Sequence, residues 1–143
     1  MNADTGVLKH LQEARDLAAV LAAAYDAFEY TMTVIRAHQD QAGSMLTAFA
    51  MSAVSAADGR DAVAFAPSFP PPAPRGTPAA AGTLDSGRDA GEVADALAAL
   101  GQLLAARLAA AAGSAQDRGD EAGCARAAGH AESIYELLRG SGP

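Results

Sequence analysis

The stretch that decides the fold is residues 7–53, which read VLKHLQEARDLAAVLAAAYDAFEYTMTVIRAHQDQAGSMLTAFAMSA. Starting at Val7 and counting alternately four and three residues onward, nearly every position is apolar. These positions are Val7, Leu11, Ala14, Ala18, Leu21, Tyr25, Phe28, Met32, Ile35, Gln39, Ala42, Leu46, Phe49 and Ala53. A seven-residue apolar repeat of this length is typical of a long amphipathic helix that packs on another helix. The sequence therefore predicts a coiled-coil-like helix over residues 1–58, and we call its apolar series the seam.

Gly43 is the position where this helix could break. Gly43-Ser44 could end one helix and begin another, with Ser44 as its N-cap. Against a break, the repeat continues unshifted through residues 35–46, and one internal glycine costs a helix only about 1 kcal/mol relative to alanine. We therefore predict one continuous helix, bent at Gly43 and on the order of 75 Å long. The alternative is a turn at Gly43, which would permit a monomeric four-helix bundle.

Residues 59–88 are predicted to be a linker rich in proline, glycine and alanine. The long helix should stop at Asp58-Gly59, because glycine readily takes the left-handed conformation that caps a helix. Six prolines follow from Pro67 to Pro78. Proline lacks an amide donor and restricts the residue before it, so this part is expected to be extended rather than helical. The short apolar stretch 62–65, together with Phe69, is expected to dock on the bundle.

Residues 89–140 are predicted to form a helical hairpin, followed by a tail at 141–143. Asp89 with Glu92 three residues later resembles a capping box, which marks the start of a helix. Gly113 should end the first helix, and Ser114 with Asp117 should begin the second. The two apolar faces are formed by Val93, Leu97, Leu100, Leu104, Leu108 and Ala111, and by Cys124, Ala128, Ala131, Tyr135 and Leu138.

These lengths predict an all-α fold that is completed by a partner. Two helices of about 25 residues are each roughly half as long as the first helix. They would leave part of the seam uncovered, and a long exposed apolar seam is an aggregation liability in a monomer. We therefore expect a helical bundle completed by dimerisation, with a homodimer or another helical protein as the partner.

Composition and charge narrow the possible functions. The formal net charge is −7, so a monomer lacks the cationic surface on which nucleic-acid binding depends. The N-terminus has no basic region followed by an apolar run, so we expect no secretory signal and a cytoplasmic location. The most apolar stretch, residues 17–24, is too short to span a bilayer.

The sequence contains no recognisable catalytic or metal-binding motif. A di-iron bundle needs a glutamate three residues before a histidine, and His10, His38 and His130 all lack one. Cys124, the only cysteine, occupies an apolar repeat position and reads as a small buried side chain. Nucleophile elbows, phosphate-binding glycine loops and zinc spacings are also missing. We therefore expect no catalytic residue, cofactor or metal, and a protein that is not an enzyme.

The aromatic and methionine side chains are concentrated in residues 25–51. They form either an ordinary core or, as an alternative, an apolar small-molecule pocket between helices near residues 25–49, with His38 and Gln39 orienting the ligand. Gln39 in the seam would otherwise set the register of paired helices, which we favour. The predicted function is a non-enzymatic interaction or assembly protein that oligomerises through its N-terminal helix. The candidate interface or pocket residues are Leu21, Tyr25, Phe28, Met32, Ile35, Gln39, Leu46 and Phe49.

Overall fold

A computed structural model describes residues 3–70 and 89–139 of the chain. These residues contain five α-helices, and no strand occurs among them. The helices are α1 (Ala3–Glu13), α2 (Leu17–His38), α3 (Leu46–Phe65), α5 (Ala90–Ser114) and α6 (Arg118–Arg139). The all-α fold class that the sequence predicts is confirmed.

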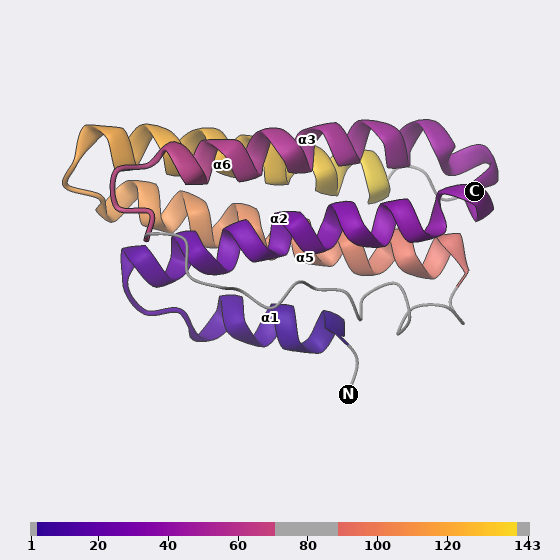
Figure 1. The fold of residues 1–143 in the computed structure, drawn as a ribbon, viewed down its shortest axis with the longest axis horizontal. Helices are drawn as coiled ribbons and strands as arrows, with labels where there is room; N and C mark the ends of the chain where they lie inside the picture. The colour runs from indigo at the N-terminus through magenta and orange to yellow at the C-terminus, as the bar shows by residue number, and fades with distance from the viewer. Residues whose placement is uncertain (1–2, 71–88, 140–143) are drawn as a thin grey trace.

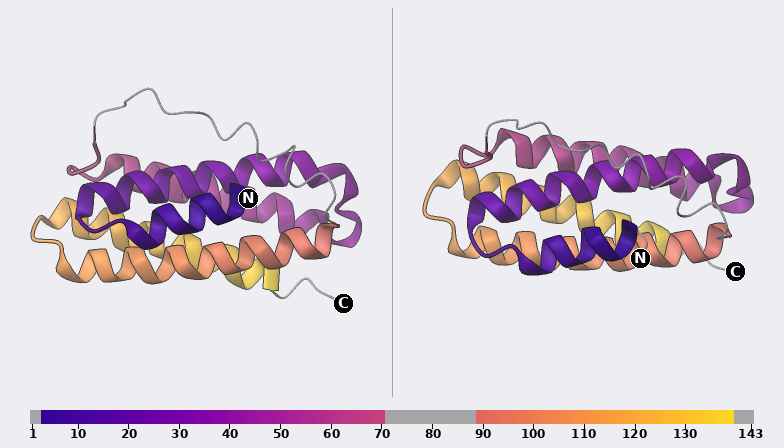
Figure 2. Two further views of the ribbon diagram at one scale, coloured as in Figure 1. Left: turned by 90° about the horizontal axis from the view of Figure 1, so that it is seen from below. Right: turned by 60° about the horizontal axis from the view of Figure 1, so that its bottom comes forward.

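Four of the helices form a bundle, in which each packs on two neighbours in the ring order α2–α3–α6–α5 (Figure 1). The pairs α2/α3 and α5/α6 are antiparallel hairpins. Helices α3 and α6 are antiparallel as well, because Gly123 near the start of α6 lies against Ala62 and Ala66 at the end of α3. The short helix α1 lies outside this ring. It packs across α2 and α5, on the side opposite α3 and α6 (Figures 1 and 2).

Aspartate side chains cap the N-termini of three helices. Asp16, Asp89 and Asp117 each accept a hydrogen bond from the backbone N–H three residues later, at 2.8, 2.8 and 3.1 Å. Such caps satisfy backbone donors that the first turn of a helix leaves without a partner. The caps at Asp89 and Asp117 lie where the sequence predicts helix starts. The cap at Asp16 was not predicted, because this residue lies inside the expected long helix.

The N-terminal region is three helices rather than one. The chain breaks first at residues 14–16 and again at residues 39–45, where two 3-10 turns, Gln39–Gln41 and Gly43–Met45, reverse its direction. Gly43 has a φ of +56°, a left-handed conformation that a side chain disfavours. The prediction of a continuous helix over residues 1–58 is therefore wrong, and the alternative of a turn at Gly43 is confirmed.

The unshifted repeat across this turn is a coincidence of spacing. Met45 is buried, whereas the predicted seam residue Leu46 is 47% exposed. Beyond the turn the buried positions follow a different phase, namely Met45, Phe49, Ser52, Ala56, Gly59 and Val63. This series contains a serine and a glycine. A search for apolar periodicity therefore cannot detect it.

Gly59 does not end α3 but makes room for a neighbouring aromatic ring. A Cβ atom at Gly59 would lie 2.5 Å from Cζ of Phe28, and the Phe28 side chain is fully buried. The glycine is thus a notch in α3 that receives a ring from α2. The helix continues to Phe65, so residues 59–65 are not linker as predicted. Most of the predicted linker, residues 71–88, lies outside the described residues.

Polar and aromatic contacts hold the exit of α3 on the bundle. The buried carboxylate of Asp120 accepts hydrogen bonds from the backbone N–H of Ser68 at 2.8 Å and from its hydroxyl at 2.6 Å. The ring of Phe69 packs against that of Tyr25, with 5.3 Å between the centroids. The predicted docking of Phe69 is therefore confirmed, and in the stretch 62–65 Ala62 and Val63 are buried, whereas Phe65 is 87% exposed.

The C-terminal hairpin and the predicted apolar face of α5 are confirmed. On α6 the buried positions include Ala127 and Ile134, whereas the predicted face residues Ala128 and Tyr135 are only half-buried. Helices α5 and α6 pack closely at Gly101, where a Cβ atom would lie 3.0 Å from the backbone oxygen of Ala131. Leucines of α5 and small residues of α6 fill the space between them. Helix α1 joins this unit through Arg107, whose guanidinium donates a hydrogen bond to the backbone oxygen of Ala14. This contact satisfies a carbonyl at the C-terminal end of α1.

Gly59→Ala should destabilise the protein, although alanine favours a helix by about 1 kcal/mol relative to glycine. The added methyl would overlap the buried Phe28 ring, and overpacking of this kind costs about 1–3 kcal/mol. Urea denaturation would measure the change in the free energy of unfolding. In a Phe28→Leu background the same alanine should cost less. An equal cost in both backgrounds would show that the ring does not impose the glycine.

Candidate functional site

The eight residues predicted from the sequence as interface or pocket candidates do not form one surface. Leu21, Phe28, Ile35 and Phe49 are buried in the core, and Tyr25 and Met32 are half-buried against it. Gln39 and Leu46 are exposed at the turn between α2 and α3. A buried side chain contacts no partner while the bundle stays folded. Of the eight, only Gln39 and Leu46 are exposed to a partner.

Gln39 and His38 lie at the end of α2 in different surroundings. Gln39 begins the first 3-10 turn and is exposed, so it occupies no position between paired helices. His38 is buried, and its Nδ1 lies 3.0 Å from the backbone oxygen of Val34 one turn earlier. The structure does not bring these two side chains together at a pocket among the aromatic residues.

The titratable residues that could support chemistry are dispersed. His10 is exposed on α1 and His130 is half-buried on α6. Within residues 3–70 and 89–139, no group of three or more His, Cys, Asp or Glu side chains is arranged to hold a metal ion. Cys124 is buried. Burial, and to a lesser extent the negative charge of Asp120, raise the pKa of its thiol.

The least expected surface is the outer face of α3. Met51 is 52% exposed, Val54 62% and Phe65 87%, although all three are large apolar side chains. Residues 51, 54, 58, 61 and 65 follow one another at steps of three and four, so they share a stripe along the helix. Asp58 and Asp61 occupy the middle of this stripe and are exposed. The outer face of α3 is therefore both apolar and acidic.

A groove of about 650 Å³ lies beside this stripe, between α3 and α6. Helix α3 contributes Met51, Val54 and Ser55 to its lining. Helix α6 contributes Gly129, Glu132, Ser133, Glu136 and Leu137. The groove is open along its length and mostly apolar, and we call it the α3–α6 groove. Helices α3 and α6, which form the groove, lie on the side of the bundle opposite α1 (Figure 1).

Gly129 is the residue of the groove that packing does not explain. A glycine inside a helix costs about 0.5–1 kcal/mol relative to alanine. Gly59, Gly101 and Gly123 offset this cost, because each allows another part of the chain to approach closely. A Cβ atom at Gly129 would meet nothing within 4 Å. What this glycine does is leave the floor of the groove open.

The charged side chains that line the groove are both acidic. Glu132 and Glu136 lie one turn apart on α6. Arg139 lies 3.3 Å from Glu136, and both side chains of this pair are more than half exposed. Glu132 has no such cation beside it among the residues that the structure describes. The groove thus offers a carboxylate at each of two successive turns.

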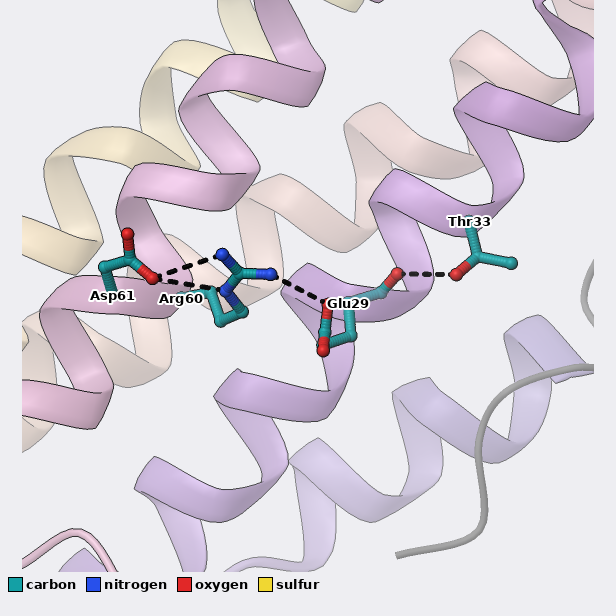
Figure 3. Close-up of polar contacts among 4 residues, drawn as sticks. All are labelled: Glu29, Thr33, Arg60 and Asp61. Carbon is teal, nitrogen blue, oxygen red and sulfur yellow. Dashed lines mark hydrogen bonds and ion pairs between the residues drawn. The ribbon is translucent and has the colours of Figure 1, made fainter.

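Arg60, the cation nearest in sequence to the acidic stripe of α3, turns away from the groove. Its guanidinium lies between Glu29 of α2 and Asp61, at 3.2 Å from an oxygen of each (Figure 3). Partial burial acts to lower the pKa of Arg60, but hydrogen bonds and charges from these two carboxylates outweigh it and raise the pKa. Arg60 therefore links α2 to α3, and its positive charge does not neutralise Asp58.

The sequence did not predict this groove, for two reasons. Its walls come from residues that are 75 to 86 positions apart in the chain, Met51 and Val54 on one side and Gly129 to Leu137 on the other. In addition, Met51 and Val54 lie outside the seam, so in a continuous helix they would be isolated exposed residues. The one available signal was the glycine in the middle of an otherwise regular helix.

Of the helices described, α5 is long and apolar enough to cross a membrane by length and composition, which residues 17–24 are not. Core helices of soluble proteins pass the same test, and the leucines at 97, 100, 104 and 108 of α5 are buried in the bundle. The helix therefore gives only weak evidence about a membrane.

Comparison of the chain with protein-family models, with curated proteins and with solved structures found no match.

Cys124 should not react with a thiol reagent while the protein is folded at neutral pH. Its side chain is inaccessible, and its raised pKa favours the neutral thiol over the reactive thiolate. Ellman's reagent should release its chromophore in full only after unfolding in urea. Because the folded state raises this pKa, the associated stability is present below the thiol's ordinary pKa and is lost as the pH rises through the raised one. Rapid labelling of the native chain would contradict the buried placement.

Gly129→Ala should stabilise the fold by about 0.5–1 kcal/mol, because the methyl group meets no neighbour and alanine favours the helix. The shift in the urea midpoint would measure this gain. Gly123→Ala is the matched control on the same helix, and it should lose stability because its Cβ atom would lie 3.0 Å from the backbone oxygen of Ala62. Loss of stability in both variants would mean that Gly129 has a packing role.

Proposed function

We propose that this protein is a non-enzymatic helical interaction protein that binds a helix of another protein in the α3–α6 groove. The observation that carries the proposal is the exposed apolar face of α3 beside an open groove of about 650 Å³. Large exposed apolar side chains beside an open groove are typical of a site for protein interaction. An amphipathic helix that lays its apolar face into such a groove is a common mode of recognition.

The fold changes the reason for expecting a partner. The sequence suggested one because the seam of a single long helix would stay uncovered. In the folded chain α2 and α3 turn back on one another, and α5 and α6 cover the rest of their apolar faces. Among the described residues, the large apolar side chains that stay exposed are Leu46, Met51, Val54 and Phe65, and of these only Leu46 belongs to the seam. The homodimer through the seam is therefore not the association we favour.

Packing also weighs against an apolar ligand among the aromatic residues of α2 and α3. Phe28 fills the notch at Gly59, and Phe49 is fully buried in the same core. The α3–α6 groove is lined by neither ring. A ligand in the region of residues 25–49 would have to displace these side chains, whereas a helix on the outer face of α3 displaces only water.

Site-directed photo-crosslinking in cells of the source organism would test the proposal. A benzophenone amino acid in place of Val54 should form a discrete crosslinked product with a second protein, because this side chain borders the groove. The same amino acid in place of Gln102, which is exposed on α5, is the position control and should form none. Denaturing gels and mass spectrometry of the product would provide the readout.

The product should disappear when the groove is filled by Gly129→Trp and should persist with Gln102→Trp. Absence of any product from position 54 would contradict the proposal. A product of twice the chain mass of 14.3 kDa, containing only this chain, would instead identify self-association through α3.

A further inference from the structure

We infer that the segment bound in the α3–α6 groove is a basic amphipathic helix, one that carries lysine or arginine beside its apolar face. This inference rests on the proposed function and specifies the chemistry of the partner. It is drawn from three features of the site: the uncovered side of the bundle, the apolar surface there, and the sign of the charges that line it.

The two sides of the bundle differ in how they are covered. On one side, α1 lies across α2 and α5 (Figure 2), and its Leu11 side chain is fully buried. On the other side no described helix covers α3 and α6, and their junction carries the groove. Helix α1 shows that the outer surface of this bundle accepts a helix. The uncovered side offers the same kind of surface to a helix from elsewhere.

The apolar part of the groove suits large side chains from such a helix. Met51 and Val54 form one wall and Leu137 part of the other, while Gly129, one turn before Glu132 on α6, leaves space for a side chain of the partner. Methionine is flexible and polarisable, and it adapts to differently shaped apolar partners. A leucine or phenylalanine above Gly129 would contact atoms of both helices. This apolar contact contributes affinity, but it does not discriminate between a basic and an acidic partner.

The carboxylates of the groove favour a basic partner over an acidic one. Glu132 and Glu136 are four residues apart, which places them about 6 Å apart along the axis of α6. Lysine or arginine residues spaced by three or four on a bound helix have nearly the same separation, so each could meet one carboxylate. Asp58 adds a third exposed negative charge on the α3 side. Arg139 would have to share Glu136 with the partner, but their pair is exposed and therefore weak.

A second copy of this chain fits the groove poorly for the same reason. Each copy has a formal net charge of −7. A two-fold contact through this face would bring Glu132, Glu136 and Asp58 of one copy close to those of the other. Like charges placed opposite one another at an interface oppose association. Charge complementarity therefore favours a basic partner over self-association.

Three synthetic helical peptides would test the inference against the full-length protein. All three, about 18 residues long, carry one leucine stripe and differ only in whether lysine, glutamine or glutamate flanks it. Fluorescence anisotropy of labelled peptides at about 50 mM salt would give each Kd. The lysine peptide should bind at least about ten-fold more tightly than the glutamate peptide, and added salt should reduce the difference.

Charge reversal provides the decisive comparison. The double variant Glu132→Lys, Glu136→Lys should invert the order, so that the glutamate peptide binds best. Glu13→Lys with Asp95→Lys changes the net charge equally on exposed positions of α1 and α5 and is the matched control. It should preserve the original order. Circular dichroism and the melting temperature would verify that both variants fold.

The outcomes separate the inference from the proposed function. Equal Kd values for the three peptides, with all binding lost in Gly129→Trp, would overturn the charge selection and leave helix binding in place. Binding of no peptide, or binding unaffected by Gly129→Trp, would overturn both. Formation of a dimer by the unmodified protein in light scattering, abolished by Gly129→Trp, would show that a second copy occupies the groove and would also overturn the inference.

Discussion

The fold depends on the contact in which the ring of Phe28 occupies the notch left by Gly59. This contact lets α2 and α3 approach closely, and it fixes which turn of α3 lies against which turn of α2. On the outside of the same pair, Arg60 bridges Glu29 and Asp61 (Figure 3). The close approach requires the chain to reverse within residues 39–45, where Gly43 takes its left-handed conformation. Once α2 and α3 form a hairpin, the C-terminal hairpin has the right length to complete a bundle within one chain.

The C-terminal half of the fold could be predicted from the sequence because its signals agree with one another. The helix starts at Asp89 and Asp117, the leucine repeat of α5 and the stop at Gly113 all indicate the same bounds for α5 and α6. In the N-terminal half the signals conflict. A single glycine is compatible with a helix interior, and Leu46 continues the apolar repeat although it is exposed. The true buried series of α3 includes Ser52 and Gly59, which reach the core because they are small. A pattern of apolar residues records hydrophobicity but not size, so it missed the turn.

The candidate site could not be predicted for a related reason. It is created by a missing side chain at Gly129 and by two apolar residues of α3 that the predicted helix left without neighbours. Only the reversal at residues 39–45 and the antiparallel packing of α3 on α6 bring Met51 and Val54 to the same place as Glu132 and Glu136. A correct prediction of the helices alone would not have found the groove. To find the groove, a prediction would also have had to give the order of the helices around the core.

The comparison of Gly59 with Gly129 bears on function. Both lie inside helices, where alanine is more stable than glycine. Only at Gly59 does packing offset this cost, because the Phe28 ring occupies the space. Local features that oppose stability without a packing reason tend to mark functional positions. Gly129 is such a feature, and it lies beside Met51 and Val54, whose exposure to water is also unfavourable. Gly129, Met51 and Val54 line the same groove, on the side of the bundle that α1 does not cover. A partner helix would remove the exposure and make use of the open floor, so binding accounts for features that the folded chain alone does not explain.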